Sequence, residues 1–202
     1  MGTLLKEKNL RMIYKESRAI PLSNFNLFFP FFIGTIIFIF LIYGNISIEE
    51  SYDKIESLIS FLFSSIFSTL GFLIAGYTIF CTITPLDLQK KMIEYTDQKT
   101  NLPFFKRVHF TFIRVFIYFL LFSFAIFIIF LFKGISINSI NMTIESKTLG
   151  IIFKYTNYLI ITFLTIGTTF LFCELSSFIF NIYNSIATTI HWSIDNQSNP
   201  KK

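Results

Sequence analysis

Four long apolar segments dominate the sequence, at residues 25–44, 57–81, 110–132 and 151–174. The first two segments contain no charged residue. A helix needs about 20 apolar residues to cross a hydrocarbon core about 30 Å thick, so each segment is long enough to span a membrane. The pattern therefore predicts an all-α membrane protein with four transmembrane helices.

Only short segments remain outside these spans. We expect a basic amphipathic segment over residues 1–24, a four-helix bundle over residues 25–185 and a tail over residues 186–202. The helical phase of the fourth span continues past Glu174, so this helix is expected to extend beyond the membrane. Pieces below about 40 residues rarely fold alone, which argues against a separate soluble catalytic domain.

The distribution of Lys and Arg predicts the orientation. Twelve of the 17 lie before the first span, between the second and third spans, or at the C-terminus, and three lie in the other two loops. The loop between the first two spans is acidic, and a further loop is expected around residues 136–147. By the positive-inside rule, we expect both termini to be cytoplasmic in a multi-pass membrane protein. The preference for Phe, Ile, Asn and Lys is typical of an AT-rich genome, so we expect a bacterial inner membrane.

Composition agrees with membrane insertion. Hydrophobic residues make up 53% of the chain and charged residues 14%, against about 25% charged in soluble proteins. The two cysteines lie in apolar segments, and the formal charge of +5 accompanies the cytoplasmic loops. These features exclude a secreted disulfide-rich domain, and no direct binding of nucleic acid is expected.

The inner loop has local signals of its own. Thr84 and Asp87 fit a capping box with Pro85 at the first helical position, which predicts a short helix through residue 95 with Leu88, Met92 and Tyr95 on one face. The N-terminal segment could form a second amphipathic helix. Their basic residues are a candidate surface for membrane lipids or for a protein partner: Arg11, Lys15, Lys90, Lys91, Lys106 and Arg107.

The second span separates small from large residues. Small residues let membrane helices approach closely, and the small residues of this span share one face at 100° per residue. This predicted helix-packing face consists of Ser64, Ser68, Gly71, Ala75 and Thr78. Packing within the chain and packing between subunits both remain open.

The fourth span carries a stripe of hydroxyl groups, which could form hydrogen bonds between helices or line a water-filled pore. The stripe consists of Tyr155, Tyr158, Thr162, Thr165, Thr169, Cys173 and Ser176.

Two ionisable residues, Arg114 and Glu174, fall at similar depth near the inner ends of antiparallel spans. Charged groups inside a membrane usually face the bundle and find a partner. We therefore expect an Arg114–Glu174 pair or a switch at Glu174. Alternatively, Arg114 reaches the lipid headgroups and Glu174 already lies in the interface.

No catalytic motif, metal-binding spacing or phosphate-binding loop occurs in the sequence. We therefore expect no catalytic residues, no metal site and no cofactor, and we do not expect an enzyme.

The four-span layout, the basic N-terminus and the segment GFLIAGYTIFCTITPLDL at residues 71–88 resemble the KwaA family, the membrane subunit of the bacterial Kiwa anti-phage system. This resemblance implies an inner-membrane sensor and scaffold that forms a homo-oligomer, a tetramer, and recruits the cytoplasmic DNA-binding subunit KwaB. It transfers no catalytic residue to this chain. The alternative is a small homo-oligomeric channel or membrane-depolarising effector, with Glu174 at the inner mouth of its pore.

Overall fold

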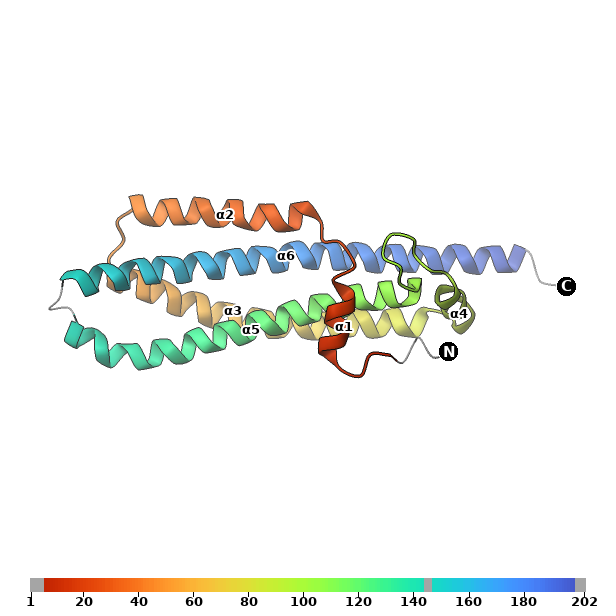
Figure 1. Ribbon diagram of the computed structural model, residues 1–202, viewed down its shortest axis with the longest axis horizontal. Helices are drawn as coiled ribbons and strands as arrows, with labels where there is room; N and C mark the ends of the chain where they lie inside the picture. Colours follow the sequence, from red (N-terminus) through yellow and green to blue (C-terminus); the bar gives the residue numbers. More distant parts are fainter. Residues whose placement is uncertain (1–5, 144–146, 199–202) are drawn as a thin grey trace. The chain divides into compact units, whose positions relative to one another are not determined.

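The computed structural model describes the backbone of residues 6–143 and 147–198 and the side chains of residues 6–132 and 148–194. This part of the chain is helical, with connecting turns and one isolated bridge but no β-strand (Figure 1). Its six helices are α1 (Leu10–Ser17), α2 (Asn24–Tyr43), α3 (Ile48–Ile83), α4 (Leu86–Glu94), α5 (Phe104–Thr143) and α6 (Lys147–Ser198).

Four of these helices, α2, α3, α5 and α6, are long and apolar enough to cross a membrane. Helices α3, α5 and α6 each contain one of the predicted apolar segments, and α2 covers the first segment up to its C-cap residue Gly44. The predicted all-α membrane protein with four spanning helices is therefore confirmed at the level of helix length and composition.

Helix α3 starts nine residues before the predicted span, because a capping box of Ser47 and Glu50 begins it. The Ser47 backbone N–H donates to Glu50 Oε2 at 3.3 Å, and the Glu50 N–H donates to Ser47 Oγ at 3.1 Å. These two reciprocal hydrogen bonds satisfy N–H groups that the start of a helix leaves unpaired. The acidic segment before the apolar run is thus the first part of the helix.

The predicted loop at 136–147 and the predicted tail are largely helical. Helix α5 continues to Thr143 and α6 begins at Lys147, so most of the predicted loop at 136–147 is helix. The predicted tail from residue 186 is also part of α6, which continues to Ser198. The apolar pattern marks the part of a helix that suits a membrane, whereas backbone hydrogen bonding continues through the polar residues beyond it.

Helix α4 confirms the predicted helix in the inner loop, but the predicted capping box is wrong. Pro85 is itself the N-cap residue and makes no side-chain cap hydrogen bond. The Thr84 hydroxyl instead donates to the Phe80 carbonyl in the preceding helix at 2.8 Å. A threonine directly after a long helix thus back-bonds to that helix rather than capping the next one.

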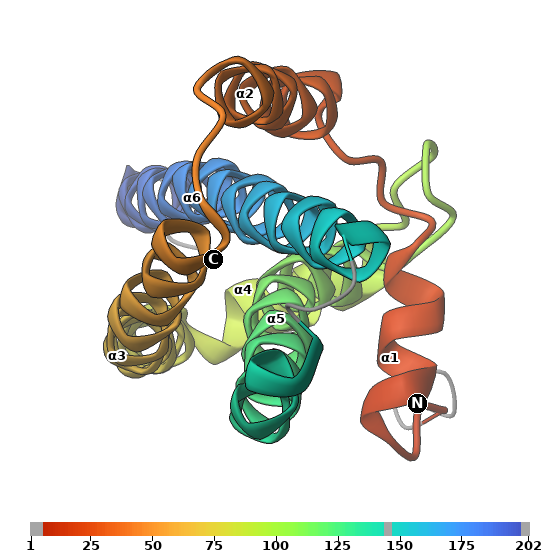
Figure 2. The same cartoon turned by 90° about the vertical axis from the view of Figure 1, so that its left-hand side faces the viewer.

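The chain divides into two compact units, and α3, α5 and α6 each contribute residues to both. Unit 2 comprises Ser23–Thr69 and Phe119–Cys173. Within it, α6 lies between α2 on one side and α3 and α5 on the other (Figure 2). Two glycines allow this close packing: a Cβ at Gly34 would overlap Ile166, and a Cβ at Gly167 would overlap the Phe122 ring.

One face of α6 also holds the turn between α2 and α3. Lys154 Nζ donates to Asn45 Oδ1 at 2.7 Å, and the Tyr158 hydroxyl donates to the Ile46 carbonyl at 2.9 Å. Next to Tyr158, Asn157 Nδ2 donates to Ser51 Oγ at 2.9 Å. These contacts fix a turn in which Asn45 has a positive φ of 44°, a conformation that asparagine tolerates well.

Unit 1 comprises the residues up to Leu22, Leu70–Tyr118 and the residues from Glu174 onwards. Aromatic rings form much of its interior. Phe112 lies 5.1 Å from Phe80 and 5.1 Å from Phe178 between ring centroids, which joins α5 to α3 and to α6. The Tyr77 hydroxyl also makes a 2.7 Å hydrogen bond with His109 Nδ1, so the polar groups in this aromatic cluster are paired.

Candidate functional site

The buried arginine of unit 1 holds the N-terminal helix. The Arg114 side chain in α5 donates from Nη1 to the carbonyl oxygens of Ser17 at 3.2 Å and Ile20 at 2.6 Å. The Ser17 carbonyl is the last of α1 and the Ile20 carbonyl follows three residues later, next to the helix end that carries partial negative charge. Arg114 therefore neutralises the end of α1 and attaches it to α5.

The position of Arg114 contradicts one of our two expectations. The residue is only 5% exposed, so its side chain does not extend towards lipid headgroups. Glu174 is 2% exposed, and both charges lie within electrostatic range of Tyr118. The two residues thus belong to one buried polar cluster in unit 1, and a direct Arg114–Glu174 pair stays a prediction.

The Arg114 guanidinium has a further hydrogen-bond donor, its Nε–H group. Its Nε is buried and has no hydrogen-bond partner within the described part of the chain. Next to it, the rings of Tyr14 in α1 and Tyr118 in α5 meet edge to face at 6.3 Å. Arg114 and this ring pair together fasten the C-terminal half of α1 to α5.

A buried ion pair holds the other end of the N-terminal segment. Lys106 Nζ contacts Glu7 Oε1 at 2.7 Å and Oε2 at 2.8 Å, and both side chains are 8% exposed. An apolar cluster of Ile20, Leu102 and Phe110, with Ile13 packed against it, lies between the N-terminal segment and α5. The segment from residue 7 to residue 20 is thus attached by charge at both ends and by apolar contact between them.

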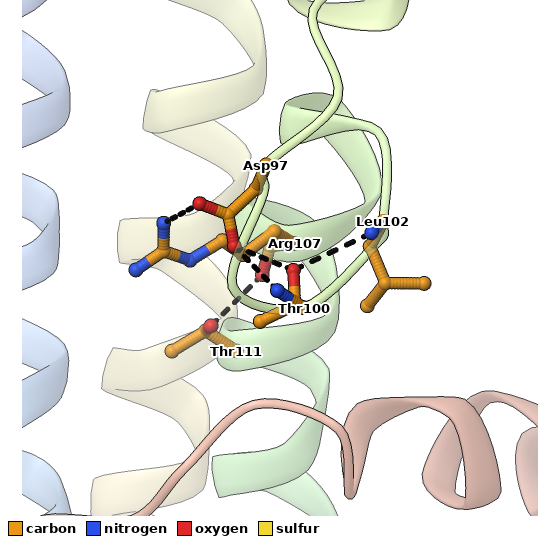
Figure 3. A network of polar contacts seen from close by, with 5 residues as sticks. All are labelled: Asp97, Thr100, Leu102, Arg107 and Thr111. Carbon is orange, nitrogen blue, oxygen red and sulfur yellow. Dashed lines mark hydrogen bonds and ion pairs between the residues drawn. The ribbon is translucent and has the colours of Figure 1, made fainter.

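The turn that leads into α5 is organised around Asp97 (Figure 3). Its Oδ2 accepts hydrogen bonds from the Thr100 N–H at 3.0 Å and the Thr100 hydroxyl at 2.6 Å, while its Oδ1 pairs with Arg107 at 3.0 Å. The strand-like bridge between Thr96 and Pro103 closes the turn. The Asp97 carboxylate therefore determines the shape of the loop and its link to α5.

These contacts stabilise the charged form of Asp97. The hydrogen bond from the Thr100 hydroxyl lowers the pKa of the Asp97 carboxyl most, and the charge of Arg107 lowers it further. Burial acts in the opposite direction but does not reverse the shift. Asp97 is thus an anion at neutral pH, and the turn depends on that charge.

The structure divides the six predicted surface residues into two groups. Arg11, Lys15, Lys90 and Lys91 are exposed. Lys106 is buried against Glu7, so its inclusion in an exposed surface was wrong, and Arg107 is only partly exposed and pairs with Asp97. Lys106 and Arg107 are less exposed because each pairs with a carboxylate, Lys106 with Glu7 and Arg107 with Asp97. Glu7 is distant from Lys106 in the sequence, and the turn separates Asp97 from Arg107.

Helix α4 packs its apolar side within unit 1. Leu88 and Met92 are buried, whereas Tyr95, the third residue of the predicted apolar face, is 61% exposed. Lys91 Nζ lies 5.6 Å from the centroid of the Trp192 ring, which joins α4 to the last part of α6. Through this cation–π contact the last part of α6 packs against α4, which the sequence did not predict.

The predicted helix-packing face of the second span does not pack within the chain. Each of its residues is exposed, and a Cβ at Gly71 would meet nothing within 4 Å. The large residues on the opposite side of α3 pack instead, including Leu62, Ile66 and Leu73. Intrachain packing of Ser64, Ser68, Gly71, Ala75 and Thr78 is therefore wrong, and packing between subunits stays a prediction.

The hydroxyl groups of the fourth span bond chiefly to their own helix. Thr162, Thr165 and Thr169 each donate to the carbonyl four residues earlier, at 2.8–2.9 Å. Such bonds satisfy a hydroxyl without a neighbouring helix or water. These three hydroxyls are thus satisfied within α6, whereas the Tyr158 hydroxyl of the same stripe bonds to the Ile46 carbonyl outside the helix.

Sequence reasoning missed Glu7 and Asp97, which organise much of the polar structure of unit 1. An aspartate three residues before a threonine is a signal for a side-chain-stabilised turn, so Asp97 and Thr100 could have been recognised. Glu7 carries no such signal, because its partner Lys106 is 99 residues away.

Comparison with protein-family models, with curated proteins and with solved structures finds no significant match to this chain.

Proposed function

We propose that this protein is a non-catalytic scaffold of a bacterial inner membrane, with both termini in the cytoplasm, that recruits a soluble effector through the outward face of α4. We further propose that it acts as a homo-oligomer in defence against phage, as its resemblance to the KwaA family implies.

The charge distribution supports this orientation. Thirteen of the 17 Lys and Arg residues belong to unit 1, and four belong to unit 2. Basic residues accumulate on the cytoplasmic side of membrane proteins. Unit 1, which contains α1, α4 and the turn at Asp97, therefore includes the cytoplasmic end of the bundle in this proposal.

The burial of α4 is the observation that carries the proposal. A helix that rests on lipid turns its apolar side towards the membrane. In α4, Leu88 and Met92 are buried inside the chain, whereas the outward side presents Lys90 and Lys91 together with Asp87 and Glu94, and Leu86 at the start of the helix is 73% exposed. Such a side suits water or a protein with complementary charges better than acyl chains.

The resemblance names a candidate effector. In the KwaA family the membrane subunit recruits KwaB, a cytoplasmic subunit that binds DNA. A soluble partner of this kind would supply the nucleic-acid binding that we do not expect of this chain. A stimulus at the envelope would then act through α3, α5 and α6, which contribute residues to both units.

A phage-challenge assay tests the proposed function. Phage should form fewer plaques on cells that express the chain with its neighbouring genes than on cells that lack it. The double variant Lys90→Glu/Lys91→Glu should lose this protection although the protein remains in the membrane. Lys90→Glu alone should weaken it, and this variant keeps the contact between Lys91 and Trp192.

The matched control is Lys54→Glu, which reverses an exposed charge in unit 2. It should keep full protection. Equal loss of protection in the control and in the α4 variants would refute recruitment through α4.

The channel alternative has a separate test. A pore lined by the fourth span should change its conductance in lipid bilayers when Thr165→Phe narrows it or when Glu174→Gln removes a charge. The hydrogen bonds of the threonine hydroxyls to their own helix give no support to this alternative. Conductance that these variants alter would nevertheless replace the scaffold proposal.

A further inference from the structure

Helix α1 lies across α5 rather than along it. Both views show the axis of α1 roughly perpendicular to the part of α5 that belongs to unit 1 (Figure 1, Figure 2). Helix α5 contains a membrane span, so a helix perpendicular to it lies parallel to the membrane plane. This is the orientation of amphipathic helices that rest in the interface between water and acyl chains.

The outward side of α1 carries a row of cations. Arg11, Lys15 and Arg18 follow the spacing i, i+4 and i+7, which places them within an arc of about 60° at 100° per residue. All three are exposed, and none forms an ion pair within the described part of the chain. Glu7, an acidic residue that could neutralise them, is buried in its pair with Lys106.

We propose that α1 is an interfacial helix whose Arg11, Lys15 and Arg18 bind the phosphate groups of anionic phospholipids. This inference goes beyond the proposed function, because it concerns a different helix and a lipid ligand.

Two observations favour lipid over an acidic protein as the ligand. Leu10 and Met12 beside the row are 50% and 36% exposed, and such apolar side chains can enter the acyl boundary next to the bound phosphates. In addition, Arg114 of the spanning helix α5 holds the carbonyls of Ser17 and Ile20. The end of α1 is thus fixed at the level of a residue near the end of a membrane span.

Native mass spectrometry of the full chain in mild detergent tests the proposal, with phosphatidylglycerol as the probe and phosphatidylcholine as the neutral comparison. Each cation near an anionic surface contributes about 1 kcal/mol. The triple variant Arg11→Gln/Lys15→Gln/Arg18→Gln should therefore bind phosphatidylglycerol about 100-fold more weakly, since 1.4 kcal/mol corresponds to a tenfold change. Its weaker binding of phosphatidylcholine should not change.

The control Lys54→Gln/Lys99→Gln removes positive charge from two exposed positions elsewhere. It should keep the affinity for phosphatidylglycerol, and so should Arg11→Lys/Arg18→Lys, which keeps the charge of α1. Unchanged affinity in the triple variant, or an equal loss in either comparison variant, would overturn the proposal. Recruitment through α4 would survive that result, because it is tested by Lys90 and Lys91 in a different assay.

Discussion

At the scale of single residues, the charges of unit 1 act mainly on the backbone and on each other. Arg114 binds the end of α1, Lys106 pairs with Glu7, and Asp97 closes the turn before α5. Arg114 was predictable as a candidate because a charge inside an apolar run is costly and needs a partner. Its backbone partners were not predictable, since they lie about 95 residues earlier in the chain and depend on how α1 packs.

Loss of Arg114 should release α1. In Arg114→Gln the carbonyls of Ser17 and Ile20 lose a charged donor, and such hydrogen bonds contribute about 1.5–3 kcal/mol each. We expect amide hydrogens of α1 to exchange about 100-fold faster or more in hydrogen-exchange mass spectrometry, since the two bonds together contribute at least about 3 kcal/mol. Arg107→Gln serves as the control, because it disturbs the turn at Asp97 but not α1. Equal exchange in the two variants would show that Arg114 does not hold the helix.

The turn before α5 should depend on pH through Asp97. Its pKa is lowered in the folded chain, so its charge stabilises the turn above the pKa of the unfolded carboxyl, about 3.9. This stabilisation is lost as the pH falls through the lower pKa of the folded state. At pH 7, Asp97→Asn should expose the Thr100 amide to faster exchange, and the difference from the natural protein should disappear in strong acid. A difference that persists there would mean that the charge of Asp97 is irrelevant.

At the scale of helices, the apolar segments predicted which helices can span a membrane but not where those helices end. Helix α3 begins early because Ser47 and Glu50 cap it, and α6 continues far beyond its apolar part. The sequence also assigned the wrong side of α3 to packing. Small residues permit close approach, but the bulky side of α3, with Leu62 and Leu73, fills the interior of the chain.

Two glycines provide a direct test of the helix contacts. A Cβ at Gly167 would overlap the Phe122 ring, so Gly167→Ala should destabilise the contact between α5 and α6 by about 1–3 kcal/mol. Gly71→Ala meets open space and gains helix propensity, so it should be neutral or slightly stabilising in the monomer. Thermal unfolding in detergent measures both variants. Destabilisation by Gly71→Ala instead would indicate that the exposed small face packs against a second copy.

At the scale of the whole molecule, hydrophobic patterning was sufficient to predict the membrane class and the four spanning helices, because both depend on local composition. The division into two units was not predictable, since it depends on contacts between distant segments. The same holds for the separate roles that we propose for α1 and α4. The sequence grouped their basic residues into one surface, whereas in the structure α4 buries Leu88 and Met92 and α1 leaves Leu10 and Met12 exposed.

The central claim is that α4 recruits a soluble effector to a membrane scaffold, and the most direct test is the mass of the intact complex. The tagged full chain would be purified from its native host in mild detergent. We predict an oligomeric membrane core with a stoichiometric soluble partner, which is lost in Lys90→Glu/Lys91→Glu and retained in Lys54→Glu. A membrane core without a partner, or a partner that remains bound to the α4 variant, would contradict the account.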